Sequence, residues 1–219
     1  NLIINNDIYD FFGGATTSAG IYVGTGSQDN TFSYNRFYQR ATRTQSTGSQ
    51  HSAIWVNNTT AGAGAIGYAV TGNYIGYGAY TATASSSGTT VTVASTDGLG
   101  IGMKVAITSG TGTLAANTYV TAINSATTFT ISAAPTVALA GATISCTAGT
   151  QAYTFAGTTS SALIPVFLNV PSSGTVTSLQ GNTIAGITMS GSSSGTNASA
   201  PFRAIYVSAG VVNIGATSG

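Results

Sequence analysis

The stretch Val70-Thr71-Gly72-Asn73-Tyr74-Ile75 decides the fold, because its pattern occurs four times in the chain. The pattern is an apolar residue, two further residues, Asn, one residue and a second apolar residue. The other copies are Ile3-Ile4-Asn5-Asn6-Asp7-Ile8, Phe32-Ser33-Tyr34-Asn35-Arg36-Phe37 and Leu179-Gln180-Gly181-Asn182-Thr183-Ile184. Their Asn residues are spaced by 29, 38 and 109 positions. Repeats of 29 to 38 residues are typical of a solenoid, in which each copy forms one coil.

A second motif alternates with the first and consists of a small residue or Pro, an aliphatic, an aromatic and an aliphatic residue. Its four copies are Gly20-Ile21-Tyr22-Val23, Ala53-Ile54-Trp55-Val56, Pro165-Val166-Phe167-Leu168 and Ala204-Ile205-Tyr206-Val207. Each coil is therefore expected to contain both motifs. The chain begins and ends inside a repeat, which indicates a segment of a longer protein.

The composition indicates an all-β protein with an uncharged polar surface. Val, Ile, Tyr, Phe and Thr form short alternating runs, and Gly, Ser and Asn separate them, which is typical of strands and turns. Charged residues make up 4% of the chain, against about 25% in ordinary domains. Glu is absent, and Lys104 is the only lysine. This composition favours an extracellular or cell-surface location.

Charge and hydropathy also exclude several classes of partner. The formal net charge is +1, so there is no basic field that would favour nucleic acid. No apolar run reaches the length of a membrane-spanning helix. The partners that remain are glycans, other copies of this chain or neighbouring surface proteins.

The last Asn spacing is too long for one coil and predicts an insertion of about 71 residues. Residues 82–151 contain neither motif and follow their own rhythm. Five short strands are predicted there: Thr90-Val91-Thr92-Val93, Met103-Lys104-Val105-Ala106-Ile107, Tyr119-Val120-Thr121-Ala122-Ile123, Phe129-Thr130-Ile131 and Thr143-Ile144-Ser145. We therefore expect solenoid coils over 1–81 and 152–219, with a small inserted β-sandwich or barrel over 82–151.

Stacked coils place equivalent residues about 4.8 Å apart, which turns each motif position into a column. The inward columns are expected to be Ile3/Phe32/Val70/Leu179 and Ile8/Phe37/Ile75/Ile184. Between them, Asn6, Asn35, Asn73 and Asn182 are predicted to form a structural ladder at a turn, because Asn tolerates left-handed backbone angles and amides can bond one another.

The aromatic column Tyr22/Trp55/Phe167/Tyr206 is expected to face outward, since buried aliphatic residues flank each ring. Two interpretations remain open. The rings can stack on sugar rings, or they can pack under a loop, against the insert or against a neighbouring chain.

The repeats resemble the right-handed parallel β-helices of the pectin-lyase-like superfamily. More narrowly, Gly181-Asn182-Thr183-Ile184-Ala185-Gly186-Ile187 and the segment 200–207 resemble the very large repetitive surface proteins of Bacteroidetes. The insert resembles a β-module of bacterial and phage surface proteins, through Gly98-Leu99-Gly100-Ile101-Gly102-Met103 and Ala126-Thr127-Thr128-Phe129-Thr130-Ile131-Ser132. The resemblance implies a secreted structural or adhesive segment. The resemblance to parallel β-helices covers roughly 1–80 and 153–219.

Polysaccharide lyases and hydrolases share this fold, so we searched for an acid–base pair. Asp7 and Arg36 occupy one column, which predicts an ion pair. Asp10 falls near Arg40 and is expected to join the same polar patch. Without Glu, we expect no catalytic residue, no metal site and no cofactor. A carbohydrate-binding or carbohydrate-active β-helix protein remains the alternative.

The other reactive side chains have simple interpretations. Asp29 and Asp97 lie in turn sequences, where Asp is common. The lone His51 is predicted to be a solvated loop residue. Cys146 is the only cysteine, so no intrachain disulfide can form, and it is expected to be a small buried side chain.

Overall fold

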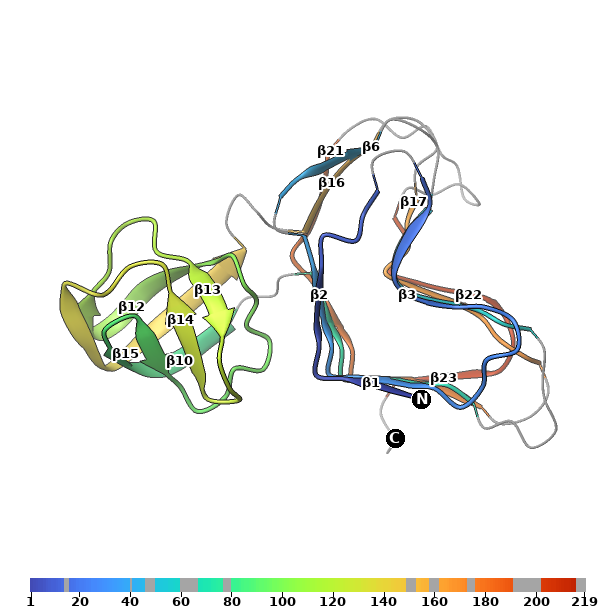
Figure 1. The fold of residues 1–219 in the computed structure, drawn as a ribbon, viewed down its shortest axis with the longest axis horizontal. Coiled ribbons are helices and arrows are strands. Elements are labelled where there is room, and N and C mark those ends of the chain that lie inside the picture. The colour runs from blue at the N-terminus through green and yellow to red at the C-terminus, as the bar shows by residue number, and fades with distance from the viewer. Residues whose placement is uncertain are drawn as a thin grey trace.

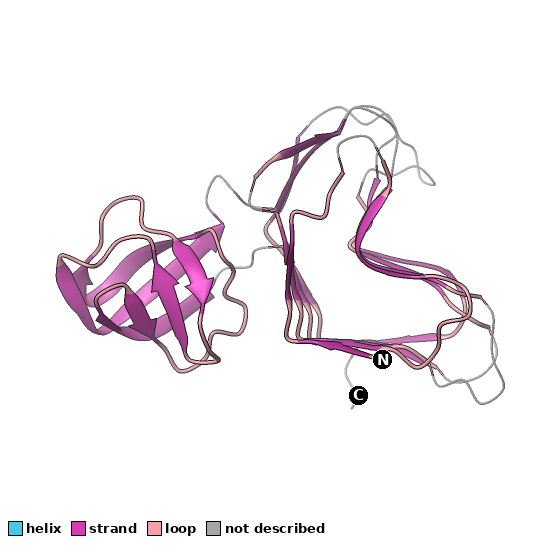
Figure 2. Cartoon of the chain, viewed as in Figure 1, coloured by secondary structure: helices cyan, strands magenta, loops and turns pink. Residues whose placement is uncertain are grey.

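The computed structural model is built from β-strands, and the part of the chain that it describes contains no helix. The described residues are 1–13, 16–39, 41–45, 50–59, 67–76, 80–148, 153–157, 162–172, 176–190 and 202–215. Figure 2 shows the strands in two groups, one of stacked parallel ladders and one antiparallel. The all-β class predicted from the short alternating runs is confirmed.

The first motif forms two parallel sheets, with one strand on each side of the Asn. One sheet consists of β1 (Leu2–Ile4), β4 (Thr31–Ser33), β8 (Ala69–Thr71), β19 (Thr177–Gln180) and β23 (Val212–Ile214), in that order. The other consists of β2 (Asp7–Tyr9), β5 (Arg36–Tyr38), β9 (Tyr74–Ile75) and β20 (Thr183–Ile184), in that order. In Figure 1 the strands of each sheet lie one behind another, and the two sheets form walls that meet at a corner.

The register of these sheets follows the repeat. Leu2 pairs with Thr31, Thr31 with Ala69 and Ala69 with Ser178, which are offsets of 29, 38 and 109 residues. These offsets equal the spacings between the Asn residues, so the four copies of the motif lie in adjacent strands. β8 and β9 pair directly with β19 and β20, although the insertion separates them in the chain.

The two predicted apolar columns line the inside of this corner. In the first sheet Ile3, Phe32, Val70 and Leu179 are register partners, and in the second Ile8, Phe37, Ile75 and Ile184 are. Phe32, Phe37, Val70 and Ile75, in the middle strands, are almost completely buried. Each such side chain stabilises the fold by about 1.5–3 kcal/mol.

The second motif forms a third parallel sheet that bends at the small residue opening the motif. Its strands are β3 (Ser18–Val23), β7 (Gln50–Asn57), β17 (Ala162–Leu163), β18 (Val166–Asn169) and β22 (Ile205–Ala209). β17 and β18 both pair with β7, and the backbone N–H groups of Ala53 and Ile54 both donate to Pro165 O. A Cβ on Gly20 would lie 2.8 Å from Ala53 O, so the bend requires a residue without a side chain there.

A fourth parallel sheet closes the remaining side of the cross-section. Its strands are β6 (Arg43–Gln45), β16 (Tyr153–Gly157) and β21 (Ile187–Ser190), with β16 in the middle. β16 follows the insertion directly and pairs with β6, which precedes it by more than 100 residues. The chain thus resumes the parallel pairing pattern after the insertion.

Residues 80–148, called the insert from here on, form one antiparallel sheet in the order β12-β15-β10-β11-β14-β13. The strands are β10 (Tyr80–Ser87), β11 (Thr90–Thr92), β12 (Met103–Thr113), β13 (Val120–Ile123), β14 (Thr128–Ile131) and β15 (Val137–Ala148). A bridge between Lys104 and Tyr119 joins the two ends of this order, which rolls the sheet into a small barrel. Phe129, Ile131, Ile144 and Met103 are buried inside.

The insert differs from the expectation in two details. It has a sixth strand, β10, and this strand begins at Tyr80, so the boundary expected at residue 82 lies inside it. The sequence of β10 alternates Tyr and Ala with Thr and Ser, and this weak contrast hid it. Tyr80 and Ala84 are buried, and Tyr80 pairs with Cys146 in β15.

Candidate functional site

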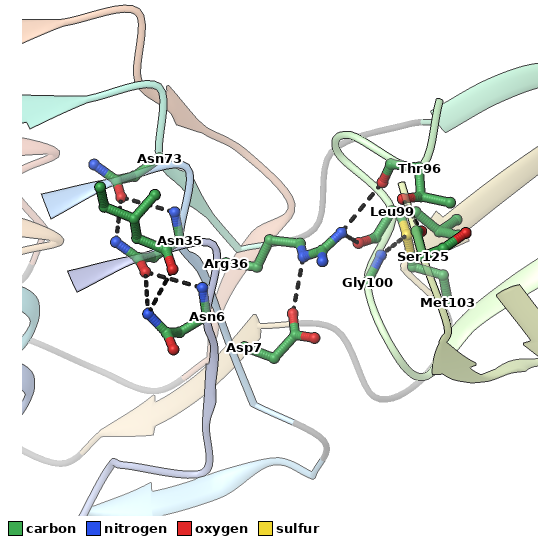
Figure 3. Close-up of polar contacts among 11 residues, drawn as sticks. Asn6, Asp7, Asn35, Arg36, Asn73, Thr96, Leu99, Gly100, Met103 and Ser125 are labelled. Atoms are coloured by element: carbon green, nitrogen blue, oxygen red, sulfur yellow. Dashed lines mark hydrogen bonds and ion pairs between the residues drawn. The ribbon is translucent and has the colours of Figure 1, made fainter. Parts of the chain in front are cut away.

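Asn6, Asn35, Asn73 and Asn182 are stacked at the corner between the first two walls, as predicted. Figure 3 shows the first three. The side-chain Nδ2 of each donates to Oδ1 of the next, at 3.0, 3.1 and 2.9 Å, and the backbone N–H donates to the same oxygen. The Nδ2 groups of Asn35, Asn73 and Asn182 also donate to backbone carbonyls in the preceding copy of the motif, each at 2.8 Å. The ladder therefore satisfies amides that are fully buried at Asn35 and Asn73.

The left-handed residue of the corner is not the ladder Asn, which corrects the sequence argument. It is the residue before it, and the four positive φ angles are 59° at Asn5, 56° at Tyr34, 63° at Gly72 and 63° at Gly181. The ladder position demands Asn because its amide bonds both neighbouring copies of the motif. The turn is made by the preceding residue, which is Gly in two of the four copies.

The aromatic column lies on the outer surface of the third sheet. Tyr22 pairs with Trp55, Trp55 with Phe167 and Phe167 with Tyr206, with ring centroids 5.7, 5.4 and 5.5 Å apart. Successive rings are tilted by 58° to 81°, so each packs its edge against its neighbour. Tyr22 is 60% exposed, whereas the flanking Ile54 and Val56 are buried.

A pair of amides accompanies the column, and sequence reasoning missed it. Asn57 and Asn169 are register partners two residues after Trp55 and Phe167, so alternation places them on the same outer face. Asn169 Nδ2 donates to Asn57 Oδ1 at 2.8 Å. The repeated aromatic-x-Asn spacing was the signal that could have revealed them.

A surface depression of about 390 Å³ adjoins the column at the bend of the sheet, lined by 17–19, Tyr22 and Trp55. In Figure 1 the insert lies on the other side of the molecule from β3 and β22. Packing against the insert, one of the open interpretations of the column, is therefore wrong. At the far end of the column, the Arg203 guanidinium lies 4.2 Å from the centre of the Tyr206 ring.

Asp7 and Arg36 form the predicted ion pair, with Arg36 Nε 2.8 Å from Asp7 Oδ1. The guanidinium has a second role that the sequence did not reveal. Its Nη1 donates to the backbone carbonyls of Thr96 and Leu99 in the insert, at 3.2 and 3.3 Å (Figure 3). Arg36 therefore connects the second wall to a loop of the insert, 60 residues away in sequence.

The other three carboxylates have different local surroundings. Asp10 lies 3.9 Å from Arg43, and its expected neighbour Arg40 is outside the described residues. Asp29 adopts a left-handed turn conformation, with φ of 55°. Asp97 lies in the loop after β11, where its backbone N–H donates to the Ser95 hydroxyl. Within the described residues, no three His, Cys, Asp or Glu side chains gather as a metal site would require.

The prediction that His51 is a solvated loop residue is wrong. His51 lies in β7, is fully buried and packs against the Phe12 ring, with centroids 4.8 Å apart. Its Nδ1 lies 2.5 Å from the Ser18 hydroxyl oxygen, and burial lowers its pKa to about 4. Polar residues surround His51 in the sequence, so no strand was predicted there. The residue lies in β7, and its imidazole ring fills the inner face of that strand.

Cys146 is buried in β15, as expected. Burial raises the pKa of its thiol to about 12, so the thiolate is suppressed at neutral pH.

Comparisons of the chain with protein-family models, with curated proteins and with solved structures found no match. Within the described residues, no helix has the length and apolar character needed to cross a membrane.

Proposed function

We propose that this chain is a non-catalytic, adhesive segment of a large secreted bacterial surface protein, and that its aromatic column binds glycan chains. In this proposal the four parallel sheets are the walls of a right-handed parallel β-helix. The repeat-matched register and the Asn ladder support a solenoid, because both require successive coils to stack directly. The right-handed sense follows the strong general preference of connections between parallel strands.

The observation that carries the adhesive function is the outer face of the third sheet. Aromatic rings stack on the apolar faces of pyranose rings, and side-chain amides bond sugar hydroxyls. Each coil supplies one ring to the column, in the order Tyr22, Trp55, Phe167 and Tyr206. Beside the rings lie two side-chain amides, those of Asn57 and Asn169. An extended glycan laid along the column would contact several rings at once, so weak contacts would add through multivalency.

The positions of the carboxylates support the non-catalytic part of the proposal. A glycosidase uses two carboxyl groups about 5–10 Å apart across a substrate cleft, one of them free to hold a proton. Asp7 is ion-paired with Arg36, and Asp10 lies beside Arg43. Both of these carboxylates therefore lie next to a guanidinium.

The test is affinity electrophoresis of the full chain through gels that contain neutral polysaccharides, such as xylan, a soluble β-glucan and starch. We expect retardation in at least one gel, and Tyr22→Ala should weaken that retardation roughly three- to tenfold. Tyr9→Ala is the matched control, since Tyr9 is a surface tyrosine that lies outside the column and is 42% exposed. Equal retardation of Tyr22→Ala and wild type would refute the assignment.

Two further outcomes would contradict the proposal. Concentration-dependent dimerisation that Tyr22→Ala abolishes, seen by analytical ultracentrifugation without glycan, would assign the column to contact between copies of the chain. Polysaccharide turnover that Asp7→Asn abolishes would establish an enzyme instead.

A further inference from the structure

A second cleft is lined by residues of the second wall, the corner and the insert. The insert lies on the side of the molecule away from β3 and β22, which carry the aromatic column (Figure 1). The volume of the cleft is about 350 Å³, within the range of small-molecule sites. The wall contributes Asp7, Arg36 and Tyr74, and the adjoining corner contributes Tyr34. The insert contributes Asp97 and Asn124 from two loops. Asp7, Arg36 and Tyr74 are register partners in adjacent strands, so they form one column that faces the insert.

The two sides of this cleft are held together by direct contacts. Arg36 bonds the carbonyls of Thr96 and Leu99, and the Thr96 hydroxyl donates to Ser125 O at 2.9 Å, which joins the two loops of the insert. Tyr74 lies against the tip of the first loop, where a Cβ on Gly98 would be 3.3 Å from its ring. The cleft is therefore formed before any ligand arrives, which lowers the entropic cost of binding.

The lining matches the chemistry of a neutral sugar. We propose that this cleft binds a single neutral pyranose unit, independently of the aromatic column. Tyr34 is 60% exposed and offers a ring face, while Asp97 and Asn124 offer planar polar groups that can bond adjacent hydroxyls. The Arg36 charge is balanced by Asp7, so Asp97 leaves the cleft with a net negative charge. That charge opposes uronic acids and phosphorylated sugars.

The distribution of charge supports a ligand site. The chain has nine side chains of formal charge at neutral pH, and three of them, Asp7, Arg36 and Asp97, line this one cleft. The contacts of Arg36 with the insert explain Arg36 and its partner Asp7, but they do not explain Asp97. Asp97 makes no ion pair within the described residues, and its carboxylate is available to a ligand.

The experiment is saturation-transfer difference NMR on the full chain, with methyl glucoside, galactoside and mannoside as neutral probes, glucuronate as the anionic probe and glucosamine as the cationic probe. We expect at least one neutral glycoside to receive saturation and glucuronate to receive none. Asp97→Ala and Tyr34→Asn should each weaken its titrated affinity roughly tenfold. Asn suits the left-handed backbone at position 34, so that variant removes the ring without straining the turn.

Tyr9→Ala is the control and should bind the glycoside as wild type does, because Tyr9 lines neither this cleft nor the aromatic column. Absence of saturation transfer to all three neutral glycosides would refute the proposal, and so would binding that both cleft variants retain. Binding of glucosamine alone would replace the neutral ligand with a cationic one.

Discussion

Replacing Asn73 with Ala tests the central claim that a buried amide ladder holds the successive copies of the first motif together. In the structure, Asn73 Oδ1 accepts from the backbone N–H and the Nδ2 of Asn35, at 3.0 and 3.1 Å. Its Nδ2 donates to Phe32 O and to Asn182 Oδ1, at 2.8 and 2.9 Å. The substitution removes four hydrogen bonds, and at about 1 kcal/mol each it should lower the free energy of unfolding by about 3–4 kcal/mol.

Asn6→Ala is the matched control, because Asn6 stands at the exposed end of the same ladder. Its side chain donates to Asn35 Oδ1 and to Ile4 O, and water can replace both bonds. The cost there should stay below about 1 kcal/mol. Urea unfolding followed by Trp55 fluorescence gives both values, because Trp55 is the only tryptophan and lies in the parallel sheets. If Asn73→Ala costs no more than Asn6→Ala, the ladder does not stabilise the fold.

Three further predictions use other residues. Gly72→Ala should cost more than Gly181→Ala in urea unfolding, because φ is +63° at both but a Cβ on Gly72 would lie 2.6 Å from the Tyr34 ring; equal costs would contradict this. Burial lowers the pKa of His51 to about 4, so on acidification the unfolded chain binds the proton before the folded chain does. The free energy of unfolding should therefore fall as the pH drops from about 6.5 to about 4. His51→Gln should flatten this pH dependence, and an unchanged dependence would exclude His51 as its source. Cys146 should resist a thiol reagent at pH 8 until urea unfolds the chain, and fast labelling of the native state would show that it is accessible.

The sequence predicted what depends on repetition. A column of equivalent residues is visible in one sequence because each repeat contributes one residue to it. The register at Phe32 and Val70, the Asn ladder and the outward rings could therefore all be derived by aligning the repeats. The insertion could be located for the same reason, since it interrupts the spacing between Asn73 and Asn182.

Features that occur once could not be derived in this way. β10 has no strong apolar alternation. His51 faces the core, where it packs against Phe12 from the connection between β2 and β3. The left-handed angle was assigned to the Asn because that residue tolerates it. The structure shows that the amide's bonds to the neighbouring copies of the motif, and not its backbone, select Asn at the ladder positions.

The column Asp7/Arg36/Tyr74 shows why the second cleft was invisible in the sequence. Register alone predicted the pair of Asp7 and Arg36, and an ion pair on an open wall would contribute little. The role of this pair depends on what faces it, which is a loop of the insert that is distant in sequence. In a chain with 4% charged residues, a column of charged side chains thus lies where the second wall meets the insert. The same reasoning would direct attention to Arg, Asp or Tyr wherever they replace Ser and Thr on the outer face of a parallel sheet.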